Sequence, residues 1–241
     1  MTEARIRLFV DQALAPGQAI GLTAGQAHYL FSVMRLAQGA VLLVFNGRDG
    51  EWRAEVAEAG RRGGVLVARD MTAPLRLPCD LWLLFAPIKK ARTDFIVEKA
   101  VELGVARILP VQTRFTNADR LRPDKLRAHA LEAAEQCGAT FVPEVAELVE
   151  LDRLLAGWES GRQILWCDEG LAGQGSSLAT LTPGPWAVLI GPEGGFSSDE
   201  QQRLRAMEQV TPISLGPRIL RADTAAVAAL VLWQAAVGDW R

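Results

Sequence analysis

Two stretches near the end of the chain share one pattern, an apolar run followed by a turn rich in Gly and Pro and then by a helical sequence. They are residues 186–200, WAVLIGPEGGFSSDE, and residues 213–225, ISLGPRILRADTA. Ala187–Ile190 has the continuous apolar character of a strand buried in a parallel sheet. Ser197 or Ser198 is a suitable N-cap for the helix that follows. Two such strand–turn–helix units side by side predict a cleft lined by backbone.

Glycine is concentrated in the first turn, at Gly191, Gly194 and Gly195. Because glycine has no Cβ, the backbone there can turn sharply and approach a ligand closely. The turn is not a P-loop, since no Lys follows the glycines, and its spacing is not that of the dinucleotide-binding fingerprint. Taken alone, it is equally consistent with an ordinary connection between a strand and a helix. The specific signal is therefore the pair of turns.

The second part of the chain alternates between strand-like and helix-like segments. The pattern predicts, in order, a strand at Leu81–Ala86, a helix at Thr93–Leu103 ended by Gly104, a strand at Ala106–Val111, a helix at Pro123–Cys137, the segment Val142–Leu148, a short helix, a strand at Gln163–Cys167 and a last helix at Arg221–Trp240. Such alternation is typical of an α/β domain with a largely parallel sheet. Ligands of these sheets bind at the carboxyl ends of the strands, where the turns after Cys167, Ile190 and Leu215 lie.

The first part of the chain is β-rich. It contains, in order, a strand at Arg5–Val10, a helix from about Gly25 to Leu36 capped by Thr23, a strand at Val41–Phe45, a hairpin turn at Asn46–Gly50, alternation at Trp52–Val56 and a strand at Val65–Ala68. Short strands separated by turns predict a small barrel. Two prolines interrupt the pattern next. We therefore expect domains at 1–72 and 80–241, joined by a linker at 73–79.

The charge of the chain is unevenly distributed. The net charge is −2, but residues 1–76 carry nine basic and seven acidic side chains, residues 77–127 ten and six, and residues 128–241 seven and fifteen. Binding of phosphates needs a local basic surface rather than a basic protein. The first half is therefore a candidate nucleic-acid surface, with scattered surface charge as the alternative.

The remaining composition sets the expected compartment. The three cysteines, Cys79, Cys137 and Cys167, are widely spaced, and the chain has two histidines. We expect no metal site and no disulfide framework, and a reducing cytoplasm as the place of work. We also expect neither a signal peptide nor a membrane span.

The two turns, IGPEGGFS at 190–197 and LGPRILRADTA at 215–225, together resemble the RsmE family of the SPOUT superfamily. The likeness extends to EKAVELGV at 98–105 and EAAEQCG at 132–138, and 28–36 is similar to the signature helix of the family's first domain. The resemblance implies a SPOUT-type, trefoil-knotted α/β methyltransferase domain with a parallel sheet, preceded by a small PUA-like β-barrel domain. Such knots are rare among protein folds.

The same resemblance implies an activity and its partners. The family uses S-adenosylmethionine to methylate N3 of a uridine in 16S ribosomal RNA of the small ribosomal subunit, and it is homodimeric. The last helix of this chain is apolar on more than one face, which also favours a dimer. Two positions depart from the family pattern: Ala139 replaces a usual Arg, which weakens the expectation of one RNA or substrate contact, and Asp223 replaces a usual Glu, which keeps the charge with a shorter reach.

The chemistry of methyl transfer to N3 indicates the catalytic candidates Arg221, Asp223 and Glu193. Loss of the N3 proton leaves charge on the ring oxygens, so the site needs a proton acceptor, Asp223 or Glu193, and a cation, Arg221. The sulfonium of the cofactor needs a nearby carboxylate, from Glu193, Asp168 or Glu169. In the alternative interpretation, Glu193 is an anion at a helix start, and Arg221 and Asp223 form a capping ion pair.

The resemblance and the predicted cleft also select binding residues. The cofactor is expected at Leu165, Cys167, Ile190, Gly191, Pro192, Gly194, Gly195, Leu215, Gly216, Ile219, Leu220, Thr224 and Ala225. RNA is expected at Arg35, Arg48, Lys89, Lys90, Arg92 and Arg114, because guanidinium and ammonium groups bind phosphate. The target uridine is expected to be single-stranded or flipped, since its reacting edge is inaccessible in a paired helix.

Three other functions remain open from the sequence. One is a 2′-O-ribose RNA methyltransferase of the same superfamily. Another is an enzyme that binds a nucleotide or phosphate in the Gly-rich turn, against which the missing Lys argues. The third is an RNA-binding module that has lost catalysis.

Overall fold

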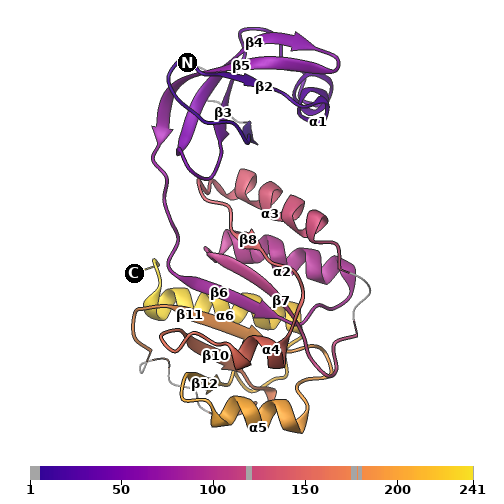
Figure 1. Cartoon of the computed structure of the whole chain (residues 1–241), viewed down its shortest axis with the longest axis vertical. Coiled ribbons are helices and arrows are strands. Elements are labelled where there is room, and N and C mark those ends of the chain that lie inside the picture. Colours follow the sequence, from indigo (N-terminus) through magenta and orange to yellow (C-terminus); the bar gives the residue numbers. More distant parts are fainter. Residues whose placement is uncertain (1–5, 118–120, 175–177, 179–180, 241) are drawn as a thin grey trace. The chain divides into compact units, whose positions relative to one another are not determined.

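The computed structural model describes residues 6–117, 121–174, 178 and 181–240 (Figure 1). Arg5, the first residue of an expected strand, lies outside the described residues. The chain divides into two compact units, Met1–Leu77 with Ala134–Val142, and Pro78–Ala133 with Pro143–Arg241. The division at Leu77 falls within the expected linker, and the finer domain bounds stay a prediction. No helix among the described residues is long and apolar enough to cross a membrane.

The first unit is built on a five-stranded sheet in the order β1-β3-β4-β5-β2. The strands are β1 (Arg7–Phe9), β2 (Ala19–Gly21), β3 (Val41–Phe45), β4 (Glu51–Gly60) and β5 (Gly63–Ala73). The pairs after β1–β3 are antiparallel, and inward-facing residues of β3, β4 and β5 alternate in one apolar core. The expected hairpin turn is confirmed, because the Asn46 side-chain oxygen accepts from the backbone N–H groups of Arg48 and Asp49.

The single α-helix expected from Gly25 to Leu36 is wrong. The structure has a short helix α1 (Ala24–Ala27), capped by Thr23 as expected, followed by a π-helix η1 (His28–Val33). The N–H of Met34 donates to the carbonyl of Tyr29, five residues back, at 2.9 Å. This wider turn keeps Leu30 in the core but leaves Val33 57% exposed.

The second unit holds a sheet in the order β12-β10-β11-β6-β7-β8, in which every pair is parallel and β9 also pairs with β7. Its strands are β6 (Leu81–Phe85), β7 (Arg107–Gln112), β8 (Glu144–Val145), β9 (Val149–Glu150), β10 (Gln163–Cys167), β11 (Trp186–Ile190) and β12 (Val210–Ile213). The helices are α2 (Lys90–Glu102), α3 (Pro123–Cys137), α4 (Leu151–Ala156), a 3-10 turn η2 (Glu169–Leu171), α5 (Ser198–Ala206) and α6 (Ala222–Val237). The expected parallel α/β domain is confirmed.

The order of the strands positions the site. Strand β10 lies between β11 and β12, so their carboxyl ends are neighbours at one edge of the sheet. Helices α2 and α6 pack on each other, and the fully buried Gln234 of α6 donates to the carbonyl of Leu103 at the end of α2. Helix α2 begins at Lys90, earlier than expected, which places Arg92 in its first turn.

Candidate active site

The three loops that follow β10, β11 and β12 enclose a cavity of about 420 Å³. Its lining consists of Cys167, Asp168, Glu169, Ala172, Ile190, Gly191, Pro192, Glu193, Gly194, Ile213, Leu215, Gly216, Arg218, Ile219, Leu220, Arg221, Ala222 and Ala225. The cavity therefore lies where the carboxyl ends of three adjacent parallel strands meet, which is the position that the fold class predicts for a ligand.

The Gly-rich loop after β11 is closely packed. A Cβ on Gly191 would meet the ring of Phe196 at 2.7 Å. Gly195 has a φ of +70°, and a Cβ there would collide with the carboxylate of Glu169. A side chain at Gly195 would be strained by this φ, and one at Gly191 would have to displace the Phe196 ring.

The helix after this loop is capped as the sequence predicts. The Ser197 hydroxyl accepts from the N–H of Glu200, and the Glu200 carboxylate accepts from the N–H of Ser197 at 2.8 Å, which forms a capping box. The same carboxylate accepts from the N–H of Arg114 at 2.8 Å and so ties the loop after β7 to α5. Glu200 thus supplies the anion at the helix start, and Glu193 is left for another role.

Glu193 and Asp223 converge on one guanidinium, that of Arg92. Arg92 Nη1 donates to Glu193 Oε1, and Arg92 Nε lies 3.7 Å from Asp223 Oδ2. Glu193 comes from the loop after β11, Asp223 from the first turn of α6 and Arg92 from α2, so the bridge joins three elements. The ion-pair partner of Asp223 is Arg92, and the capping pair between Arg221 and Asp223 that we considered is not seen among the described contacts.

The loop after β10 gives the cavity an acidic side. Asp168 is buried and accepts from the N–H of Gly170 and from Arg205 Nη2, at 2.9 and 3.0 Å. Burial and, to a lesser degree, the charge of Asp168 raise the pKa of Glu169. Burial also raises the pKa of the Cys167 thiol, so this thiol stays in its neutral form. A carboxylate in such surroundings favours a cationic ligand.

The loop after β12 contributes cations to the lining. Arg218 and Arg221 both line the cavity, and Arg221 is exposed at the N-cap position of α6, where its side chain makes no capping hydrogen bond. Gly216 has a φ of +111°, and its carbonyl accepts from the N–H of Gly173, which joins two of the three loops. The site thus combines backbone groups, carboxylates and Arg221, whose side chain makes no capping hydrogen bond.

Most of the expected cofactor residues line this cavity. Leu165, Gly195 and Thr224 do not: Leu165 is buried inside β10, Gly195 is buried in the loop, and Thr224 is exposed on α6. Asp223 also lies outside the lining and reaches the site through Arg92. Ala172, Ile213, Arg218 and Ala222 were missed; Arg218 and Ala222 lie within the second turn pattern, which pointed to them, whereas nothing in the sequence singles out Ala172.

The expected RNA-binding residues fall in both units. Arg35 and Arg48 belong to the first unit; Arg35 is exposed with a φ of +57°, and Arg48 donates to the carbonyl of Asp11. In the second unit, Lys89 occupies the N-cap position of α2 without a side-chain capping hydrogen bond, Lys90 pairs with Asp94 at 3.1 Å, and Arg114 is exposed after β7. Of the four in the second unit, Arg92 is the one with a described ion pair to the catalytic candidates Glu193 and Asp223.

Comparison with protein families matches both units. Residues 75–234 match an RNA methyltransferase domain, and residues 22–67 match an RNA methyltransferase PUA domain. The chain is 30% identical over 230 residues to ribosomal RNA small subunit methyltransferase E of Synechocystis sp., covering 90% of this chain and 74% of that protein. It is 28% identical over 228 residues to the protein of the same name from Rickettsia conorii, covering 93% of each.

Solved structures agree with this assignment. A methyltransferase of Legionella pneumophila in complex with its bound cofactor SAM has a TM-score of 0.84 and 30% identity, covering 97% of this chain and 98% of that one. Ribosomal RNA small subunit methyltransferase E of Neisseria gonorrhoeae, bound to S-adenosyl methionine, has a TM-score of 0.82 and 25% identity, covering 98% and 99%. The chain belongs to the ribosomal RNA small subunit methyltransferase E family.

Proposed function

We propose that this protein methylates N3 of a uridine in 16S ribosomal RNA of the small subunit, with S-adenosylmethionine as the methyl donor. The observation that carries the proposal is the cavity of about 420 Å³ at the ends of three parallel strands, in a chain of this family. Relatives hold this cofactor in chains of the same fold.

The residues present fit the cofactor. The turns at Ile190–Pro192 and Leu215–Gly216 offer backbone N–H and C=O groups between apolar side chains, which suits an adenine ring. Glu169, Asp168 and Glu193 form the acidic side, which suits a sulfonium cation. The cofactor supplies an activated methyl group. The chain supplies positioning, which meets a large part of the barrier of an in-line transfer.

The carboxylates around Arg92 are suited to accept the proton that N3 must lose. Glu193 or Asp223 is the proton acceptor in this proposal, and Arg92 keeps the two carboxylates together. Arg221 is the cation for the charge left on the ring oxygens, since this residue lines the cavity and its side chain makes no capping hydrogen bond. Arg92, which the sequence assigned to RNA phosphate, becomes a positioning residue.

The proposal also covers the oligomeric state, the RNA contacts and the compartment. Helix α6 carries the exposed Leu232, and α2 carries the exposed Phe95, which suit a homodimer of the kind the resemblance implies. Arg35, Arg48, Lys89, Lys90 and Arg114 are exposed cations for RNA, and the trefoil knot and the cytoplasm belong to the same expectation. The substrate is a single-stranded or flipped uridine.

The first test is calorimetric titration of the full chain with S-adenosylmethionine, with ATP as the control. We expect binding of S-adenosylmethionine alone. Transfer of a labelled methyl group to small ribosomal subunits, followed by nucleoside analysis, should then give N3-methyluridine. The variant Arg221→Ala should keep its melting temperature and cofactor affinity and lose most of its turnover.

Other outcomes would change the proposal. A 2′-O-methylated product would move the protein to the rival chemistry of its superfamily. Binding of RNA and cofactor without transfer would indicate an inactive RNA-binding module. Full activity of Arg221→Ala would remove this residue from the mechanism.

A further inference from the structure

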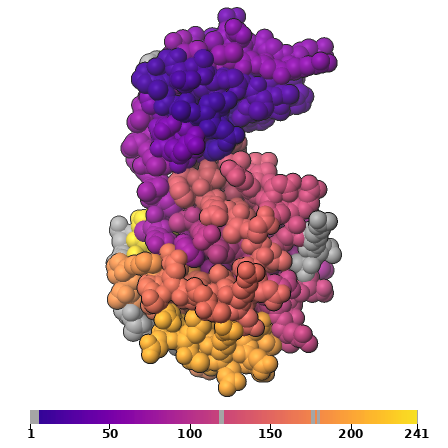
Figure 2. Space-filling view, in the orientation of Figure 1, coloured from indigo at the N-terminus to yellow at the C-terminus, as the bar shows by residue number. Residues whose placement is uncertain are grey.

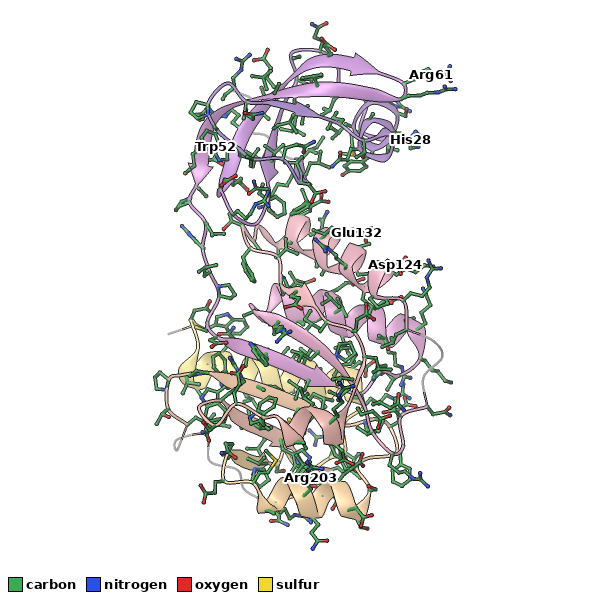
Figure 3. All side chains as sticks on the ribbon, viewed as in Figure 1. His28, Trp52, Arg61, Asp124, Glu132 and Arg203 are labelled. Carbon is green, nitrogen blue, oxygen red and sulfur yellow. The ribbon has the colours of Figure 1, made fainter. Side chains whose placement is uncertain are left out.

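A second, smaller cavity lies between the start of α2 and the start of α3. Its volume is about 130 Å³, and its lining consists of Ile88, Lys90, Thr93, Asp94, Leu121, Arg122, Lys125 and Leu126. The two helices lie side by side in Figure 1, and Figure 3 labels Asp124, two residues after Arg122, at the start of α3. All eight residues belong to the second unit, and none lines the larger cavity.

The inner wall of this cavity is apolar and preformed. Ile88 and Leu126 are 6% and 3% exposed. The Thr93 hydroxyl accepts from the N–H of Ile88 at 3.1 Å and donates to its carbonyl at 3.0 Å, which fixes the turn that leads into α2. A flat, partly apolar group can therefore enter without rearrangement of the backbone.

Asp94 supplies the recognition group in the wall. Its side chain is only 14% exposed, accepts from Lys90 Nζ at 3.1 Å and lies 3.6 Å from Nε2 of His129. A carboxylate has about four lone-pair sites, so Asp94 keeps the capacity to accept further N–H groups. It favours a ligand edge that carries amino groups and disfavours one flanked by carbonyl oxygens.

Three cationic side chains line the cavity, whereas Asp94 is the one anionic residue of its described lining. They are Lys90, Arg122 and Lys125. Arg122 pairs with Asp124 at 3.0 Å, but both side chains are more than half exposed, and such pairs contribute little. The guanidinium can therefore turn to a phosphate, and the surplus of positive charge favours a polyanion.

We propose that this cavity is a subsite for one nucleotide of an RNA strand, with a base that carries an exocyclic amino group against Asp94 and the phosphates against Arg122 and Lys125. Cytosine, adenine and guanine present such an edge. Uracil presents two carbonyl oxygens around its single N–H and is rejected.

The test is fluorescence anisotropy of the full chain with labelled hexanucleotides of cytidine, adenosine or uridine. We expect the wild-type protein to bind the cytidine and adenosine strands at least about fivefold more tightly than the uridine strand. Asp94→Asn should abolish this preference, because an amide can donate to a uracil carbonyl. The double variant Arg122→Ala with Lys125→Ala should weaken the binding of all three strands. The slope of log K against log salt concentration should become shallower by about 0.7 per lost phosphate contact.

Arg203→Ala is the matched control. Arg203 is a half-buried cation of α5 that pairs with Asp152 at 3.0 Å, as Arg122 pairs with Asp124, and Figure 3 labels it far from α3 within the second unit. In the space-filling view of Figure 2, atoms with the colour of α5 lie at the surface. This variant should bind every strand like the wild type, and the melting temperature of each variant reports on its fold.

Two results would overturn the proposal: an unchanged base preference in Asp94→Asn, or RNA affinity of the double variant equal to that of Arg203→Ala. The inference rests on the proposed function for its substrate, but the two fail separately. Absence of cofactor binding and methyl transfer in the wild type, with RNA binding that depends on these residues, would remove the function and leave the subsite. Methyl transfer together with RNA binding that does not depend on these residues would remove the subsite and leave the function.

Discussion

At the scale of the residue, Arg92 is the position whose assignment changes most between sequence and structure. Its guanidinium holds Glu193 through Nη1 and approaches Asp223 through Nε. A lysine has one ammonium and cannot serve both carboxylates in this way. We predict that Arg92→Lys and Arg92→Ala both lower kcat at saturating RNA by about tenfold or more, which corresponds to about 1.4 kcal/mol of barrier.

Separate measurement of kcat and KM distinguishes a positioning role of Arg92 from a contact to RNA phosphate. A contact to RNA phosphate would raise KM for RNA and reduce the salt dependence, with kcat recovered at saturation and largely restored by lysine. Lys89→Ala, one of the expected phosphate contacts at the exposed cap of α2, serves as the comparison and should show that second pattern. Recovery of kcat in Arg92→Lys at high RNA would return Arg92 to RNA binding.

Glu169 gives the site a predicted pH dependence. Burial and the neighbouring Asp168 raise its pKa, so Glu169 loses its charge at a higher pH than an ordinary glutamate. The ionised form favours a cationic cofactor, and affinity for S-adenosylmethionine should fall as the pH drops through this raised pKa. The free energy of unfolding changes in the opposite sense, since a raised carboxyl pKa means that the native protein binds the proton more tightly than the unfolded chain, and stability therefore rises as the pH drops through this range.

Calorimetry over a pH series, in buffers of different ionisation enthalpy, measures both the affinity and the protons exchanged. In Glu169→Gln the affinity should be lower at neutral pH and the pH dependence should vanish. An unchanged pH profile in this variant would show that another group controls binding.

At the scale of the element, the loop after β11 depends on glycine at one backbone position. Gly195 has a φ of +70° and lies against the Glu169 carboxylate. We predict that Gly195→Ala costs about 1 kcal/mol or more of stability and weakens cofactor binding, because alanine is strained at this positive φ and the loop must shift to relieve the strain. Gly161→Ala is the control, since its φ is ordinary and nothing lies within 4 Å of an added Cβ. Thermal unfolding and cofactor titration of both variants test this, and equal behaviour would contradict it.

Some elements were readable from the sequence for clear reasons. Strands Val41–Phe45 and Gln163–Cys167 and helix Pro123–Cys137 have the predicted bounds, because each has an uninterrupted pattern between turn residues. The π-turn at His28–Val33 was not readable, since a periodicity of 3.6 cannot reveal one wider turn. The cavity loops were found through glycine spacing, whereas the bridge made by Arg92 depends on how α2 packs beside α6, which no local pattern encodes.

At the scale of the whole molecule, the prediction concerns association. Helix α6 buries Ala226, Leu230 and Trp233, yet its Leu232 is 37% exposed, and Phe95 on the neighbouring α2 is 39% exposed. Such apolar side chains on two packed helices are suited to burial against a second copy. We therefore predict a homodimer by light scattering at micromolar concentration.

Leu232→Asp should shift this equilibrium to the monomer, because dimerisation would bury an unpaired charge. Leu148→Asp is the matched control, since Leu148 has a similar exposure of 40% and lies outside both helices. If the active site needs the second copy, the monomeric variant also loses methyl transfer while retaining its melting transition. A wild-type monomer, or two variants that dissociate alike, would show that the apolar surface of α6 and α2 has another purpose.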